Sequence, residues 1–174
     1  MMKYLLQPVL ILFATVNLTF AQNNRVFSDQ AGQVILLGYG DRSGMESTPF
    51  DEWFSMEYDG YQPDRKIIDE LQGMAHDVEI TIVMGTWCSD SRREVPRFFK
   101  ILDEIGVTED QVTIYYVDRD KTCPDIDTQK IRIERVPTFI FNKNDTELGR
   151  IIESPVNNLE KDITEILKNN NHGK

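Results

Sequence analysis

Residues 78–91 read VEITIVMGTWCSDS, and this stretch decides the fold class of the 174-residue chain. Its first seven residues are rich in β-branched and apolar side chains, which predicts a buried strand over 78–84. The strand runs directly into a turn that carries Trp87 and Cys88. Beyond that turn, apolar residues recur at helical spacing over 89–105. The stretch therefore predicts a central strand, a tight turn that holds the cysteine, and a helix that begins right after it.

Downstream of this helix, the hydrophobic pattern predicts the remaining elements of a mixed sheet. The expected elements are, in order, a strand at 112–117, a polar loop at 118–125, a short helix at about 127–133, and strands at 136–141 and 147–152. Ser154 and Pro155 are expected to cap a final helix whose apolar stripe is Val156, Leu159, Ile163, Ile166 and Leu167. This order predicts an α/β fold with a central mixed sheet and helices on both faces.

The segment 22–76 precedes this domain as an N-terminal extension, which we expect to pack on a domain that spans 77–168. Its expected elements are a strand at 33–37, a glycine-rich loop at 38–44, and helices at about 49–60 and 63–73. Residues 169–174 are expected to form a polar tail.

The N-terminal residues 1–21 have the pattern of a secretory signal peptide. They carry one charge, Lys3, an apolar run over 5–16, and small residues before a cut after Ala21. A retained membrane anchor is the alternative, but Pro8 and Asn17 interrupt the run and leave it short of the ~20 apolar residues that span a bilayer. We therefore expect a periplasmic or secreted protein with no stable membrane anchor.

The composition is that of a soluble globular domain with an acidic surface. The chain has 19 Lys and Arg against 29 Asp and Glu, a formal net charge of −10. Such a surface repels nucleic acid and anionic membranes, which argues against both as partners. His76 and His172, with Cys88 and Cys123, lack the spacing of metal ligands. We expect a monomer with no metal and no cofactor.

From about residue 78 to 167, the order of elements and several landmark residues resemble the thioredoxin family. The landmarks are Trp87-Cys88 at the strand-to-helix turn, Pro96 eight residues after the cysteine, the segment 133–138 ahead of the hairpin, and the closing amphipathic helix. This resemblance covers about half of the chain and implies a thioredoxin-like fold. It also implies that Pro137 is a cis residue facing Cys88. The substrate-binding residues that it implies are Trp87, Ser89, Asp90, Val136 and Pro137.

Three departures separate the chain from the dithiol reductases of that family. Ser91 replaces the second cysteine of their Cys-x-x-Cys motif, Ile82 replaces a buried acidic residue, and Ser89-Asp90 replaces a central Gly-Pro pair. The chain therefore lacks the second, neighbouring thiol that the usual dithiol cycle requires. The sequence predicts exchange through one nucleophilic cysteine, of an isomerase-like or deglutathionylation-like kind. The expected partner is a thiol- or disulfide-containing protein or a small thiol.

Cys88 is the predicted nucleophile because of its place at a helix N-terminus. There, unpaired backbone N–H groups and the helix dipole stabilise a thiolate. We expect Ser91, one turn along, to hydrogen-bond to the sulfur. A nearby Asp90 carboxylate opposes ionisation of the thiol, whereas Arg92 or Arg93 favours it.

Cys123 is a further catalytic candidate because it follows a strand expected to lie parallel to the one before Cys88. Both cysteines are then expected at the same edge of the sheet, where open α/β sheets bind ligands. Three roles remain open for Cys123: an unpaired loop thiol, a resolving thiol, or a disulfide partner of Cys88.

Two other functions compete with thiol exchange. In the first, the fold is a non-catalytic binding module in which Trp87 and Pro137 form a peptide groove. The second is peroxidase chemistry of the peroxiredoxin kind, which ranks third because residues 82–88 lack the proline and the threonine or serine spacing of that family.

Overall fold

A computed structural model describes residues 24–169, so the predicted signal peptide and its cleavage after Ala21 lie outside the described residues, as do residues 170–174 of the predicted tail. The strands are β1 (Val26–Ser28), β2 (Val34–Leu36), β3 (Gly38–Gly40), β4 (Glu79–Met84), β5 (Val112–Tyr116), β6 (Thr138–Lys143) and β7 (Thr146–Ile152). The α-helices are α1 (Asp51–Gly60), α2 (Arg65–Leu71), α3 (Ser89–Ile105) and α4 (Leu159–Asn169). No helix within this described range is long and apolar enough to cross a membrane.

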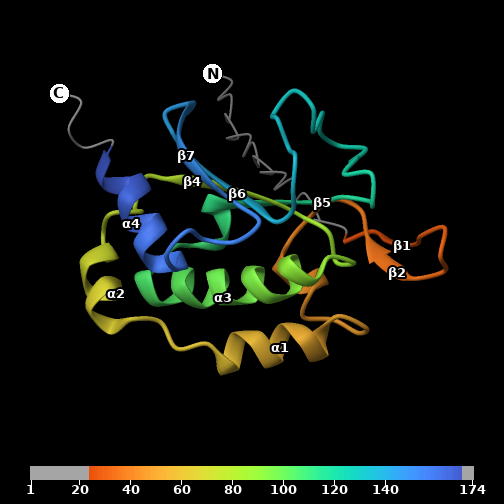
Figure 1. The fold of residues 1–174 in the computed structure, drawn as a ribbon, viewed down its shortest axis with the longest axis horizontal. Helices are drawn as coiled ribbons and strands as arrows, with labels where there is room; N and C mark the ends of the chain where they lie inside the picture. Colours follow the sequence, from red (N-terminus) through yellow and green to blue (C-terminus); the bar gives the residue numbers. More distant parts are fainter. Residues whose placement is uncertain (1–23, 170–174) are drawn as a thin grey trace, which may run out of the picture.

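The central element is a mixed five-stranded sheet in the order β3-β5-β4-β6-β7 (Figure 1). Strand β4 lies at its centre, parallel to β5 and antiparallel to β6. Ile82, at the middle of β4, lies between Ile114 of β5 and Phe139 of β6 in the register. The remaining two strands, β1 and β2, form a separate antiparallel hairpin. The α/β fold class with a central mixed sheet is as the sequence predicts.

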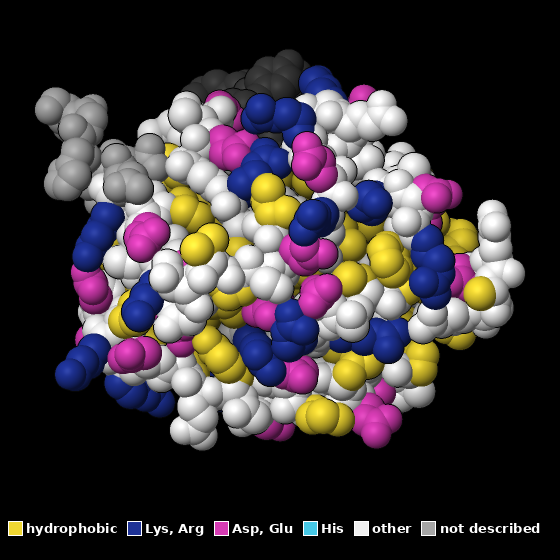
Figure 2. Space-filling model, viewed as in Figure 1, with side chains coloured by type: hydrophobic (Ala, Val, Ile, Leu, Met, Phe, Trp, Pro, Cys, Tyr) yellow, Lys and Arg dark blue, Asp and Glu magenta, His cyan; other side chains and the backbone are white. Residues whose placement is uncertain are grey.

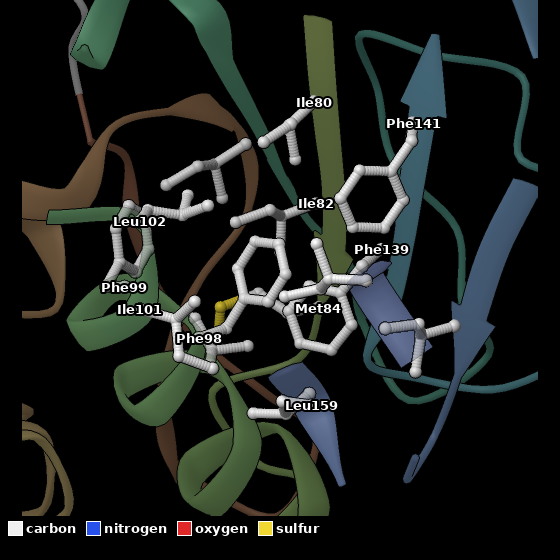
Figure 3. Packing of buried hydrophobic residues seen from close by; sticks show 14 of the residues in the cluster. Ile80, Ile82, Met84, Phe98, Phe99, Ile101, Leu102, Phe139, Phe141 and Leu159 are labelled. Carbon is white, nitrogen blue, oxygen red and sulfur yellow. The ribbon is translucent and has the colours of Figure 1, made fainter. Parts of the chain in front are cut away.

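The main core lies between the sheet and the helices, on one face of the sheet. Alternate residues of β4 point into it, because side chains of a strand alternate between faces (Figure 3). Figure 3 shows these residues facing Phe98 and Leu102 of α3 and Phe139 and Phe141 of β6. Buried residues of α1, α2 and α4 belong to the same cluster, whose members from the sheet and α3 include Ile80, Ile82, Met84, Phe98, Phe99, Ile101 and Leu102.

All four α-helices of the described range therefore cover the same face of the sheet, with α1 against α3 and α2 against α4 (Figure 1). This differs from the expected arrangement with helices on both faces. The second face carries a smaller apolar cluster, which the irregular segment 118–137 covers; its buried members are Val83, Val117, Ile133, Val136 and Ile140.

The helix predicted at about 127–133 is wrong, and its absence explains this one-sided arrangement. The carboxylate of Asp127 accepts hydrogen bonds from the backbone N–H groups of Gln129 and Lys130, as at the start of a helix. The turn does not propagate, because Arg132 adopts a left-handed conformation with φ 57°. The N–H of Ile133 then bonds back to the carbonyl of Thr128 at 2.9 Å. The segment is therefore a closed turn.

The loop predicted at 38–44 is wrong in its first part, since Gly38–Gly40 forms the edge strand β3. It pairs antiparallel with β5, where Gly40 lies opposite Ile114. A Cβ on Gly40 would come within 2.7 Å of the Tyr116 ring, so glycine lets the edge strand approach that ring closely.

The last helix begins later than predicted, at Leu159. The Asp162 carboxylate accepts hydrogen bonds from the N–H groups of Val156 and Asn157, which keeps both residues outside the helix. Val156 is therefore 92% exposed and does not belong to the apolar stripe. Leu159, Ile163 and Leu167 of that stripe are buried against the main core.

Candidate functional site

Cys88 lies where β4 ends and α3 begins, at the N-cap position of α3. Its backbone N–H donates to the carbonyl of Gly85 at 2.9 Å, and its carbonyl accepts from the N–H of Arg92 at 3.0 Å. The hydrogen bond to Gly85 closes the turn between β4 and α3, and the one from Arg92 is the first hydrogen bond of α3. The side chain is half-buried, and its thiol forms no disulfide. The structure thus places a reachable thiol at the N-terminus of a 17-residue helix.

The segment before β6 lies against this thiol. The Cys88 thiol donates a hydrogen bond to the carbonyl oxygen of Val136, with 3.3 Å between Sγ and O. The next peptide bond, Val136–Pro137, is cis. The fold therefore brings together Cys88, Val136 and Pro137, which lie almost 50 residues apart in the sequence.

Trp87 forms another wall beside the cysteine. Its Nε1–H donates to the carbonyl of Val117 at 2.9 Å, at the end of β5. The guanidinium carbon of Arg119 lies 5.4 Å from the centre of the indole ring, within the range of a cation–π contact. A Cβ on Gly85 would come within 2.5 Å of the indole, so the ring lies over a position that has room only for glycine. These contacts hold the half-buried indole in place next to Cys88.

Ser91 differs from its expected role. It is fully buried, and its hydroxyl oxygen accepts a hydrogen bond from the N–H of Gly85 at 3.4 Å. Within residues 24–169, the hydrogen bond found for the Cys88 sulfur is the one to Val136, and none joins it to Ser91. Ser91 therefore supports the turn beneath the cysteine. Sequence spacing placed it one turn along, but could not show which backbone group its hydroxyl meets.

The charged residues after Cys88 are paired with one another. Asp90 and Arg93 form an ion pair at 2.7 Å, and Arg93 also pairs with Glu94 at 2.7 Å. These carboxylates raise the pKa of Arg93, chiefly through its hydrogen bond with Glu94. Arg92 donates to the carbonyl of Thr86 at 2.6 Å. Both arginines named as candidates to favour the thiolate thus have partners other than the sulfur, and Ser89 is exposed to solvent.

Cys123 is the second free thiol, and it packs against the same apolar cluster as Cys88. It lies in the irregular segment after β5 and makes an isolated bridge with Ile126. Burial raises the pKa of the Cys123 thiol, although backbone hydrogen bonds with Ile126 act in the opposite direction. The structure holds the two thiols unlinked, on the same face of the sheet.

The raised pKa of Cys123 predicts slow alkylation at mildly alkaline pH. Since the thiolate is the reactive form, fewer Cys123 side chains react at a given pH in the folded protein than in the unfolded one. In a Cys88→Ala variant, we expect the pH midpoint of iodoacetamide alkylation, followed by intact mass, to be higher for native protein than in urea. A native midpoint at or below the urea value would contradict the burial effect.

Two residues that the sequence did not single out also contact the site. Thr86 is fully buried, and its hydroxyl accepts a hydrogen bond from the N–H of Leu36 in β2 at 3.1 Å. Arg119 lies over Trp87 and reaches Asp29 at 2.8 Å. The contacts of Thr86 with Leu36 and of Arg119 with Asp29 join residues 50 or more positions apart, so no local pattern could reveal them. In the part of the chain described, no group of three or more His, Cys, Asp or Glu side chains could hold a metal ion.

The arrangement of strands, helices and site residues identifies the fold. β4 is central between a parallel β5 and an antiparallel β6, Cys88 caps the helix after β4, and a cis-proline precedes β6 beside the thiol. The fold is thioredoxin-like.

Several solved structures of other proteins are similar to the chain at low sequence identity. The chain is similar to a protein of unknown function from Pseudomonas aeruginosa, with a TM-score of 0.54 and 12% identity over 77% of this chain and 93% of that one. An HIV epitope-scaffold gives a TM-score of 0.50 and 14% identity over 74% and 82% of the two chains. Thioredoxin from Fasciola hepatica gives a TM-score of 0.38 and 23% identity over 60% and 88%. No protein-family model matches the chain, and no curated protein matches it.

Proposed function

We propose that the chain is an exported thiol–disulfide exchange protein with a single nucleophilic cysteine, Cys88. The observation that carries the proposal is the free, half-buried thiol at the N-terminus of α3, with its sulfur against the carbonyl before Pro137. Backbone N–H groups at a helix N-terminus stabilise a thiolate, which is the nucleophile in exchange. The signal-peptide pattern over 1–21 supports action in the periplasm or outside the cell.

In the first step, the Cys88 thiolate attacks one sulfur of a disulfide in the partner. A bond forms between Cys88 and that sulfur, the partner's S–S bond breaks, and its other sulfur leaves as a thiolate. In the second step, another thiolate attacks the partner's sulfur in this mixed disulfide, a new S–S bond forms there, and the bond to Cys88 breaks, so that Cys88 leaves as a thiolate. When the attacking thiolate is a different cysteine of the partner, one partner disulfide is replaced by another without net gain or loss of electrons, which is isomerisation. When the attacking thiolate is a small external thiol, that thiol is oxidised to a disulfide with the sulfur that Cys88 held, and the sulfur that left in the first step is reduced to a thiol.

The residues around the sulfur suit the binding of an extended partner segment. The Val136 carbonyl accepts the Cys88 S–H in the free protein, so loss of that proton frees this carbonyl to accept an N–H from the partner. The indole of Trp87 offers an apolar surface on another side. Ser91 carries no thiol and is buried, so it cannot release the partner. The thiolate that releases the partner from Cys88 must therefore come from outside the turn next to the cysteine. This favours isomerisation, or removal of a small thiol from the partner, over net reduction of a partner disulfide.

The proposal is tested by following the mixed disulfide over time. The reduced protein is mixed with a disulfide-linked peptide, without other thiols, and its intact mass is recorded by mass spectrometry. We expect a one-to-one adduct on Cys88 that persists until a small thiol is added, and the same adduct in a Cys123→Ala control. Absence of any adduct would favour the non-catalytic binding module. An adduct that decays to a Cys88–Cys123 disulfide without added thiol would contradict the single-cysteine mechanism.

A further inference from the structure

The β1–β2 hairpin is attached directly to the loop that carries Cys88. The N–H of Leu36 in β2 donates to the Thr86 hydroxyl, two residues before the cysteine, and this hydrogen bond is buried. Arg119 makes a second link: it donates to Asp29 and Gln33 of the hairpin and lies over the ring of Trp87. In Figure 1, the hairpin lies beside the start of α3. Two independent connections thus hold the hairpin next to the candidate nucleophile.

A groove of about 450 Å³ separates this hairpin from the segment 118–120. Phe27, Ile35 and Leu37 contribute apolar side chains to its lining, and Asp118, Arg119 and Asp120 contribute charged ones. Because Arg119 also covers the Trp87 ring, the groove begins beside the indole that flanks Cys88. The groove is therefore linked to the candidate site through Arg119 and Trp87, and its lining residues do not include Cys88 or Val136.

Several large apolar side chains of the hairpin are exposed to solvent. Val26 is 60% exposed, Phe27 43% and Val34 37%, although large apolar side chains are usually covered. Figure 2 shows hydrophobic side chains next to charged ones at the right-hand end of the molecule, where Figure 1 places the hairpin. Within the described residues, β1 pairs with β2 alone. Of these three exposed side chains, Phe27 lines the groove, whereas Val26 and Val34 lie on the other face of the hairpin.

The charge of the groove indicates what kind of side chain it accepts. The lining contains the carboxylates of Asp29, Asp118 and Asp120, with one cation, Arg119. That guanidinium already pairs with Asp29 at 2.8 Å, so the remaining carboxylates leave the groove net negative. A groove lined by both apolar side chains and carboxylates is complementary to a segment that has an apolar side chain and a Lys or Arg.

We propose that this groove binds the part of a partner protein that flanks its reacting cysteine, with an apolar residue against Phe27 and a Lys or Arg near Asp118 and Asp120. The proposal rests on the thiol exchange proposed for Cys88 and names the substrate class: extended segments that are apolar and basic next to their disulfide. The hairpin then determines which disulfides react, while Cys88 performs the exchange.

The test compares two peptides that carry the same disulfide. In one, the cysteine is flanked by Leu and Lys; in the other, by Ser and Glu. We expect the wild-type protein to form the mixed disulfide with the first peptide about tenfold faster, as expected from burial of one apolar side chain. Phe27→Ser should reduce this preference to about twofold. Met56→Ser is the matched control, because Met56 is a 64% exposed apolar residue on α1, and it should keep the full preference.

A binding measurement separates this inference from the proposed function. Fluorescence anisotropy of the labelled peptides, with their cysteines blocked, is recorded with the Cys88→Ala variant. If the wild-type protein forms no adduct but the apolar, basic peptide binds in a Phe27-dependent way, thiol exchange is refuted and the groove assignment is supported. If both peptides react at equal rates and Phe27→Ser changes neither rate, the groove assignment is refuted and thiol exchange is supported. Circular dichroism confirms that the variants fold.

Discussion

Replacement of Cys88 by alanine is expected to lower the second-order rate constant for mixed-disulfide formation on the order of 1000-fold, to the background of the assay. The reason is that the sulfur at the N-cap of α3 is the nucleophile, and alanine keeps the backbone turn without it. The measurement is adduct formation with a disulfide-linked peptide, quenched with acid and read by intact mass. Circular dichroism should show an unchanged fold, since Cys88 is only half-buried.

The matched control is Cys123→Ala, which removes the other free thiol of the described range. Burial raises the pKa of Cys123, so less of it is thiolate near neutral pH, and we expect this variant to react within about threefold of the wild-type rate. If instead Cys88→Ala formed the adduct at the wild-type rate, peptide mapping would place the reaction on Cys123. That result would move the nucleophile to the segment after β5.

Replacement of Phe98 by alanine is expected to lower the free energy of unfolding by about 3–5 kcal/mol. Phe98 is fully buried in α3, at the centre of the core in Figure 3. Its ring stacks on Phe139 with 4.2 Å between centroids and meets Phe141 edge-on at 5.9 Å. The substitution thus leaves a cavity between α3 and β6, in a domain whose stability is typically about 5–15 kcal/mol. Urea denaturation followed by circular dichroism measures the change.

Val156→Ala is the control for the stability measurement. Val156 is 92% exposed, just before α4, so its truncation should change the free energy of unfolding by less than about 0.5 kcal/mol. A loss below about 1 kcal/mol for Phe98→Ala would show that the main core does not depend on the contact between α3 and β6.

Local patterns were enough to predict the centre of the molecule. The run over 78–84 forms β4, and the helical spacing after it forms α3 with the bounds Ser89–Ile105. Both elements are long, strongly patterned and buried on one side, which makes the period of the apolar residues clear. Resemblance to a family implied that a cis Pro137 faces Cys88; in the structure the Val136–Pro137 bond is cis, and the Cys88 sulfur lies 3.3 Å from the carbonyl oxygen of Val136.

The parts that the sequence did not predict depend on which hydrogen-bonding groups meet in the folded chain. Gly38–Gly40 carries turn-like residues, but it forms a strand because β5 offers a free edge next to it. Residues 127–133 have the composition of a short helix. The left-handed backbone conformation of Arg132 nevertheless ends the helical hydrogen bonding after a single turn. The hydroxyl of Ser91 meets Gly85 across the turn, and Leu36 meets Thr86 across 50 residues. No local sequence pattern indicates any of these conformations or contacts.

The two sides of the candidate site differ in how freely mutation can change them. Cys88 lies between β4 and α3, whose side chains fill the main core, so substitutions in these two elements cost stability. Arg119, Cys123 and the Val136–Pro137 pair all belong to one irregular segment, 118–137, on the face without helices. Irregular surface segments tolerate insertions and substitutions better than packed elements do. Related chains can therefore diverge in partner preference through this segment while they inherit the same sulfur on the same scaffold.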